Sequence, residues 1–279
     1  MKNAAIPMAN VQGNWRFVPT APGLKVYQAL GANGQTASGA GDTRSSAYLR
    51  CKGELAEIEA LNVSTVSVRQ ADVWTGVASG PSADETRARA ALEAIERMAV
   101  DLWWHGVLTA REMTANPFVA TTEAMLRLGQ TTRDTVVYLI DPFAIAPVAV
   151  ALSMDARGAN LIPGYGAGWC HEEAKGKALR EMAMMELNLF DARPAQRKRI
   201  RWIRQKISLL HPDHCSALYG DPPNSALGSD GFDQRVNAAG FALSFRDISV
   251  RADHQVWIAR LAPTGCDHRP VPRHCLPIL

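Results

Sequence analysis

The sequence predicts a mixed α/β fold, and two kinds of pattern within its 279 residues support this prediction. Apolar residues recur at helical spacing in three stretches, near residues 39–61, 76–104 and 164–190, and each stretch begins with a glycine-containing loop. Between the first two stretches, residues 63–68 alternate between apolar and polar types, as a half-buried strand does. The similarity of the three loop-helix units indicates internal pseudo-symmetry.

Composition and charge are those of an ordinary soluble globular protein. Hydrophobic residues make up 47% and charged residues 20%, and the formal net charge of +3 is too small to indicate a nucleic-acid partner. No apolar run has the length of a membrane span, and the start of the sequence has no apolar signal core. The five cysteines are odd in number and scattered, which is typical of reduced thiols. We therefore expect a cytoplasmic protein with no membrane partner.

The length of the chain is sufficient to bury about three quarters of its unfolded surface in one large domain. We therefore expect a single domain over residues 1–279. Residues 1–38 are rich in Gly, Pro, Asn and Thr, and they predict an irregular N-terminal segment with room for one or two strands.

The first loop-helix unit reads SGAGDTRSSAYLRCKGELAEIEAL. Glu54 and Glu57 lie together along the edge of its apolar stripe, and Arg50 lies one turn before them. Two interpretations stay open. Arg50 and Glu54 form an ordinary surface ion pair worth about 0.2–0.5 kcal/mol, or the two carboxylates belong to a binding site.

The second unit, GVASGPSADETRARAALEAIERMAVDLWW, has a Gly, Ser and Pro loop before its helix. A loop that leads into a helix N-terminus is a natural place to hold a phosphate. Ser82 and Glu85 have the spacing of a capping box, so helix capping and metal binding are alternatives for the same carboxylate. The polar face of the helix carries Glu85, Arg89, Glu93 and Glu96.

The third unit reads GYGAGWCHEEAKGKALREMAMMELN. Its predicted buried face consists of Ala174, Ala178, Met182, Met185 and Leu189. One edge of this face carries Lys177, Glu181, Met184 and Asn188.

These three stretches resemble the nucleotide motifs of the YcaO-domain family, and the resemblance covers residues 39–279. Members of this family use ATP to phosphorylate a peptide backbone amide, and so form azolines, thioamides or amidines. The resemblance implies a YcaO-type fold in which the motif helices pack on mainly antiparallel sheets. It also implies ATP and Mg2+ as cofactors and a role in the biosynthesis of ribosomal peptide natural products (RiPPs).

The site residues that the resemblance implies are Gly39, Gly41, Glu54, Glu57, Glu85 and Glu181. The two glycines and the first two glutamates match the first motif, and the other glutamates match acidic positions in the second and third. We expect the four glutamates to converge and to hold Mg2+ against the phosphates, because carboxylate oxygens suit this ion. Phosphoryl transfer is mostly positioning and charge neutralisation, so no catalytic nucleophile is assigned.

Several polar or cationic positions of the family motifs differ in this chain. Arg50 stands at the serine and Ile58 at the arginine of the first motif. In the second motif Ala78 replaces a serine and Pro81 an asparagine, and in the third Met184 replaces a glutamine. Each lost hydrogen bond to a charged phosphate costs about 1.5–3 kcal/mol. The combined losses predict weak or absent ATP binding by the isolated chain.

Three functional interpretations follow. The first is an ATP-dependent enzyme that modifies a peptide backbone amide. The second is a degenerate, ATP-independent scaffold or peptide-binding subunit of a modification complex. The third is the same fold used for another chemistry. In the first two, the partners are a peptide with a leader and a separate recognition or modifying protein, since we expect no such domain before Gly39.

Two further features carry groups that can bind a partner or a metal. A predicted helix at residues 194–210 has a basic face, which is either ordinary solvated surface or a site for an acidic peptide or partner. Near the end of the chain, Cys266, His268, His274 and Cys275 have zinc-binding side chains, but their spacing matches no standard zinc site.

Overall fold

The structure is a computed structural model, and it describes residues 11–31, 34–64, 73–104, 107–158, 160–191, 231–251 and 254–265. Backbone contacts divide the chain into two compact units. The first unit comprises residues 1–17, 25–94 and 240–269, and the second comprises residues 18–24, 95–239 and 270–279. Our expectation of one domain over residues 1–279 stays a prediction.

The first unit contains two antiparallel sheets of three strands and the helix α1 (Arg44–Val63). One sheet has the order β1-β2-β3 and consists of β1 (Gly13–Arg16), β2 (Lys25–Leu30) and β3 (Thr36–Gly41). The other has the order β4-β10-β9 and consists of β4 (Trp74–Gly80), β10 (Gln255–Pro263) and β9 (Phe241–Asp247). The helix α2 (Ala83–Trp104) begins in this unit and continues into the second.

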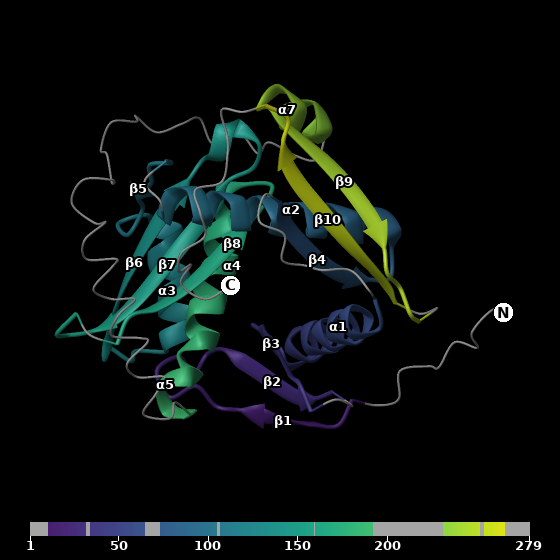
Figure 1. Cartoon of the computed structure of the whole chain (residues 1–279). Coiled ribbons are helices and arrows are strands. Elements are labelled where there is room, and N and C mark those ends of the chain that lie inside the picture. Colours follow the sequence, from purple (N-terminus) through teal and green to yellow (C-terminus); the bar gives the residue numbers. More distant parts are fainter. Residues whose placement is uncertain are drawn as a thin grey trace. The chain divides into compact units, whose positions relative to one another are not determined.

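Helix α1 lies between the two sheets of the first unit (Figure 1). In its first half, Cys51 packs with Tyr27 of β2. In its second half, Ala60 packs with Val77 of β4 and Ile258 of β10. Because a sheet covers each side, α1 needs small side chains on more than one face.

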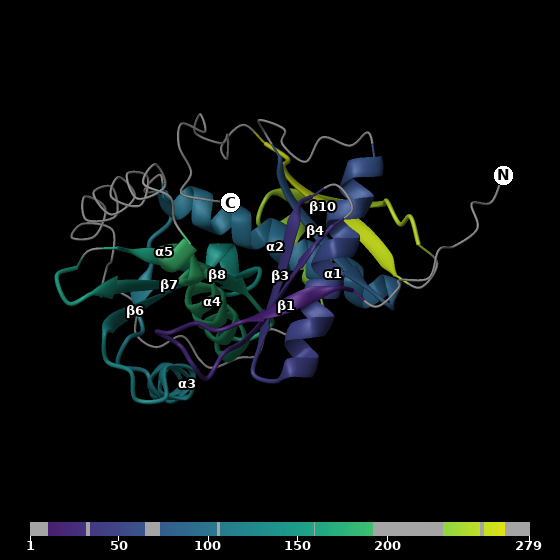
Figure 2. The same ribbon diagram turned by 90° about the horizontal axis from the view of Figure 1, so that it is seen from below.

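The second unit contains a four-stranded antiparallel sheet with helices packed against it. The strands, in sheet order, are β5 (Arg111–Glu112), β6 (Arg133–Ile140), β7 (Val148–Asp155) and β8 (Ile162–Ala167). The helices are α3 (Pro117–Arg127), α4 (His171–Met185), α5 (Leu187–Asp191) and α7 (Phe232–Ala238), with a short 3-10 helix η1 (Pro142–Ala144). Helix α4 runs along β7 and β8 (Figure 2).

A buried ionic network holds the end of α4 against the sheet of the second unit. Glu186 is fully buried, and its Oε2 and Oε1 accept hydrogen bonds from Arg127 Nη1 at 2.7 Å and Nη2 at 2.9 Å. Arg133 Nε and Ser153 Oγ donate to Oε1 at 3.2 and 2.5 Å, and the Thr20 hydroxyl donates to Oε2. Burial opposes ionisation, but these hydrogen bonds and the Arg127 charge hold the pKa of Glu186 below its ordinary value.

The predicted mixed fold of helices on antiparallel sheets is confirmed. One local prediction was wrong: Val63 is the last residue of α1 and does not begin a strand, because the helix continues until the Ser64 N–H caps it by donating to the Ala60 carbonyl. Residues 65–68, the basic helix predicted at 194–210 and the Cys and His residues at 266–275 lie outside the described residues. Within the described part, no helix is both long and apolar enough to cross a membrane.

Candidate functional site

Three strand-turn-helix units, β3-α1, β4-α2 and β8-α4, share one local geometry. In each, the strand lies at an edge of its sheet within the described part of the chain. Glycines bring the strand and helix backbones together: a Cβ added at Gly76 would lie closer than 3.0 Å to the Ala90 carbonyl, and one at Gly164 would be as close to the Ala178 carbonyl. Gly39 makes the same kind of approach to α1. The three predicted loop-helix units are therefore present as repeats of one packing arrangement.

A glutamate on each helix accepts a hydrogen bond from the open edge of the strand. In every case the backbone N–H donates to Oε2, and donor and acceptor are 16 residues apart in the sequence. The pairs are Ser38 and Glu54 at 2.8 Å, Val77 and Glu93 at 3.0 Å, and Tyr165 and Glu181 at 3.1 Å. This hydrogen bond holds one oxygen of each glutamate in place and gives a partner to a strand N–H that is not paired within the sheet.

A cationic side chain one helical turn before each glutamate binds a carbonyl oxygen on the same strand edge. Donor and acceptor are 10 residues apart in all three units. The pairs are Arg50 and Ala40 at 2.7 Å, Arg89 and Ser79 at 2.5 Å, and Lys177 and Ala167 at 2.9 Å. These charged side chains also protect the strand edges from pairing with another chain.

In the first unit, Glu54, Glu57 and Glu93 form a carboxylate cluster. Burial, together with repulsion from Glu93 and Glu54, raises the pKa of Glu57 to about 8. Burial also raises the pKa of Glu54, and the Glu93 charge adds to this effect, while the Ser38 N–H opposes it. Such raised values mean that burial and, to a smaller extent, the neighbouring carboxylates disfavour the ionised form of these groups. A bound cation would favour their ionised form.

The hydroxyl of Ser79 lies at the same cluster. Ser79 is 5% exposed, and it lies near enough to Glu57 to lower the pKa of that carboxyl. Its Oγ nevertheless makes no hydrogen bond of ordinary geometry within the described part of the chain. The cluster thus contains a buried polar group without a partner of its own.

The carboxylate cluster fits Mg2+ by the chemistry of its donors, but it is not a complete cage. No group of three His, Cys, Asp or Glu side chains in the described ranges is arranged to hold a metal ion. In Glu54 and Glu93 one oxygen already accepts a strand N–H. Mg2+ usually binds through one or two carboxylates and keeps several waters, so it does not require a preformed cage.

The second unit has a related but smaller acidic site. The Ala167 N–H donates to Glu96 Oε2 at 2.9 Å, and Glu181 accepts from Tyr165. Burial, followed by the charges of Glu181 and Glu96, raises the pKa of Tyr165. Three residues after Glu181 the chain has Met184, whereas α1 and α2 have a second glutamate at that position.

The glutamates that the sequence predicted as ligands belong to both compact units, and their convergence stays a prediction. Glu54 and Glu57 lie together in the first unit, whereas Glu181 lies in the second. Glu85 is exposed in the first turn of α2, about 12 Å along the helix from Glu93. The predicted glycines Gly39 and Gly41 are buried in β3, next to α1.

Sequence reasoning did not select Glu93, Glu96 or Ser79 as site residues. Helical periodicity assigned the two glutamates to the polar face of α2, and Ser79 belonged to a loop motif. One pattern in the sequence indicates Glu93: in all three units, a cationic residue precedes a glutamate by four positions. These pairs are Arg50 and Glu54, Arg89 and Glu93, and Lys177 and Glu181.

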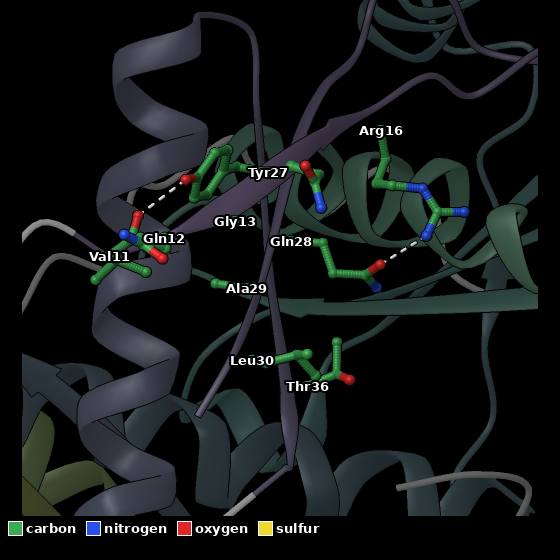
Figure 3. Close-up of a pocket in the computed structure, with 10 residues that line it drawn as sticks. Val11, Gln12, Gly13, Arg16, Tyr27, Gln28, Ala29, Leu30 and Thr36 are labelled. Carbon is green, nitrogen blue, oxygen red and sulfur yellow. Dashed lines mark hydrogen bonds between the residues drawn. The ribbon is translucent and has the colours of Figure 1, made fainter. Parts of the chain in front are cut away.

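A separate groove of about 780 Å³ lies on the β1-β2-β3 sheet of the first unit (Figure 3). Arg16 Nη1 donates to Gln28 Oε1 at 2.6 Å, and the Tyr27 hydroxyl donates to the Val11 carbonyl at 2.9 Å (Figure 3). Among the described residues that line the groove, Arg16 carries a positive charge and none is acidic. Its composition therefore differs from that of the carboxylate cluster.

Comparison with known protein families gives one match. The family model described as YcaO cyclodehydratase, ATP- and Mg2+-binding, matches residues 67–268, which is more than half of the chain. Among curated proteins, none matches this sequence.

Solved structures with a similar fold include YcaO from Methanopyrus kandleri bound with AMPPCP and Mg2+ (TM-score 0.66, 15% identity, 96% of this chain and 90% of that chain). A heterocyclase in complex with substrate and cofactor has a TM-score of 0.67 and 15% identity over 94% of this chain, which spans 50% of the heterocyclase chain. The E. coli microcin synthetase McbBCD complex has a TM-score of 0.57 and 12% identity, over 95% of this chain and 89% of that chain. At these identities the similarity establishes the fold.

Proposed function

Because the chain belongs to the YcaO family, we propose that it is an ATP-dependent enzyme that activates a backbone amide of a peptide. The product would be an azoline, a thioamide or an amidine in a ribosomal peptide natural product. The observation that supports this function most strongly is the carboxylate cluster of Glu54, Glu57 and Glu93, in which burial and the neighbouring charges disfavour ionisation and a cation would favour it.

We assign Mg2+ to this carboxylate cluster. When bound, Mg2+ and ATP would supply a phosphoryl group and the neutralisation of its charge, which activates an amide oxygen as a leaving group. The chain's own residues orient the ligands: the N–H groups of Ser38 and Val77 hold Oε2 of Glu54 and Glu93. Glu85 and Glu181 stay predicted ligands.

We also propose that the groove on the β1-β2-β3 sheet receives an extended, acidic segment of the peptide. In the described part of the chain β1 is an edge strand, and edge strands can add a peptide as a further strand. Arg16 and Gln28 offer polar side chains along the groove. Arg16 is the charged residue among the described residues that line the groove, so the groove favours a negative ligand.

The test replaces Glu57 by Gln and follows a co-expressed precursor peptide by mass spectrometry. Wild type should produce a loss of one water's mass or an exchange of oxygen for sulfur, and Glu57→Gln should not. Glu59→Gln on the same helix is the matched control, because Glu59 pairs with Arg251 at 2.6 Å. Glu85→Gln tests the predicted ligand on α2: if Glu85 only caps the helix, Gln is tolerated.

Normal modification by the Glu57→Gln variant would refute the metal role of the carboxylate cluster. The scaffold interpretation makes a different prediction, namely that the wild type binds the peptide but modifies it in no partner combination. Calorimetry with Mg-ATP separates the two, because a scaffold should not bind the nucleotide.

A further inference from the structure

Two arginines flank the carboxylate cluster in the first unit. Arg50 occupies the position of the serine in the family motif and precedes Glu54 by one helical turn. Arg89 has the same position relative to Glu93. Each arginine therefore adds a positive charge about 6 Å along the helix from a cluster carboxylate.

Both guanidinium groups lie at the turn between a strand and the following helix. Arg50 Nη1 binds the Ala40 carbonyl, shortly before the N-cap Thr43 of α1. Arg89 Nη2 lies so close to Gly80 that a Cβ at that glycine would be within 3.0 Å of it. Helix N-termini favour anions, because their first N–H groups have no partner within the helix. The arginines add full charges where an anion is already favoured.

The unpartnered hydroxyl of Ser79 indicates that a ligand belongs at this place. Its backbone carbonyl binds Arg89, and its buried Oγ lies beside Glu57 without a hydrogen bond of ordinary geometry among the described residues. Ser79 therefore connects the arginine to the carboxylate cluster. A polyphosphate fits this arrangement of carboxylates, Ser79 and Arg89. One phosphate can face a cation bound to the carboxylates, and the neighbouring phosphate can face the arginine.

Protection of the strand edge explains part of this arrangement. Lys177 binds the equivalent carbonyl of β8, so a cation at this position has a structural role in all three units. This role does not exclude ligand binding, because a guanidinium has five N–H donors and can engage several acceptors. Arginine also recognises phosphate in a bidentate manner, which serine cannot do.

We propose that Arg50 and Arg89 bind the phosphates of the nucleotide and replace polar contacts that the family motifs have lost in this chain. This inference rests on the proposed function, since it places an anion at the same site. One consequence can be measured. With two side-chain cations at the site, a polyphosphate binds even without Mg2+, and it does so through these arginines.

The experiment titrates the full chain with two probes in separate calorimetric measurements, sodium triphosphate in EDTA and Mn2+ alone. Arg50→Ser and Arg89→Ser should each weaken triphosphate binding by about tenfold or more. The double variant should lose more, and Arg50→Lys should retain part of the affinity. Arg246→Ser on β9 is the control, because this exposed residue is separated from β4 by β10. Circular dichroism and thermal unfolding check that each variant is folded.

The two probes separate this inference from the proposed function. Triphosphate binding that is absent in wild type, or unchanged in the folded double variant, would overturn the role of the arginines. Wild type that binds triphosphate through the arginines but does not bind Mn2+ would support the arginines and refute the metal assignment. If Mn2+ binding depends on Glu57 but triphosphate binding does not depend on the arginines, the metal assignment is supported and the role of the arginines is refuted.

Discussion

Replacing Glu57 by Gln should stabilise the cation-free protein at neutral to mildly alkaline pH. In the unfolded chain this carboxyl ionises near its ordinary pKa of 4.5, whereas in the folded protein it keeps its proton up to about pH 8. Between these values the folded state holds the additional proton, so the free energy of unfolding falls as the pH rises. Below pH 4.5 both states are protonated and the effect disappears.

The magnitude follows from the same two values. At about 1.4 kcal/mol per pH unit, the interval from 4.5 to about 8 gives an upper bound of about 5 kcal/mol. Glu57 is only partly buried, and solvent and relaxation reduce such costs, so we expect about 2–3 kcal/mol. Glu54 is present in wild type and variant alike, so the comparison reports mainly on Glu57.

Urea unfolding in EDTA at about pH 4.5, 6 and 8 measures this effect. The free energy of unfolding of Glu57→Gln should be close to that of wild type at the lowest pH and exceed it by about 2–3 kcal/mol at the highest. Glu59→Gln should follow the pH dependence of wild type. Parallel curves for wild type and Glu57→Gln would show that the folded state does not raise the pKa of Glu57.

Three other predictions concern separate parts of the fold. Gly164→Ala should cost about 2 kcal/mol or more, because the added Cβ would lie closer than 3.0 Å to the Met182 N, whereas Gly265→Ala has open space; equal melting temperatures would contradict this. Glu186→Gln should cost about 3–5 kcal/mol, because two buried arginines lose their partner. Because its pKa is lowered in the folded protein, Glu186 stabilises wild type above pH 4.5, and this contribution should disappear as the pH falls through the pKa of the folded state. If Glu186→Gln lowers the free energy of unfolding by less than about 1 kcal/mol in urea unfolding, the role of the network is refuted. Arg16→Glu should weaken binding of a fluorescent peptide of alternating Glu and Val about fivefold or more, and unchanged anisotropy titrations would remove the groove as a peptide site.

The fold was predictable because each of the three motif helices has a buried face that follows from its apolar periodicity. Ala47 and Cys51 of α1 are fully buried, as the periodicity predicts, and so are Ala91 and Ile95 of α2. Glycine-containing loops correctly marked the turns before these helices. Periodicity does not show which element packs against each helix face. Residues 39–61 alone therefore did not show that α1 packs between two sheets.

The candidate site was predictable only in part, because its contacts join residues far apart in the sequence. Glu54 and Glu57 were found through their motif, but Glu93 meets them only after α1 and α2 have packed on β3 and β4. The hydrogen bond of Arg50 to the Ala40 carbonyl could not be predicted, because no side-chain pattern reveals a backbone acceptor. Backbone acceptors of this kind follow from sheet order and become visible with the fold.

The most direct test of the central claim is a calorimetric titration of Mn2+ into the nucleotide-free protein, because carboxylate sites for Mg2+ also bind Mn2+. The cluster of Glu54, Glu57 and Glu93 predicts that wild type and Glu59→Gln bind the ion with similar affinity. Glu57→Gln should bind it about tenfold more weakly or not at all, since one charged ligand is lost. Equal Mn2+ affinity in wild type and Glu57→Gln, or no Mn2+ binding by wild type, would contradict the assignment of a metal to this cluster.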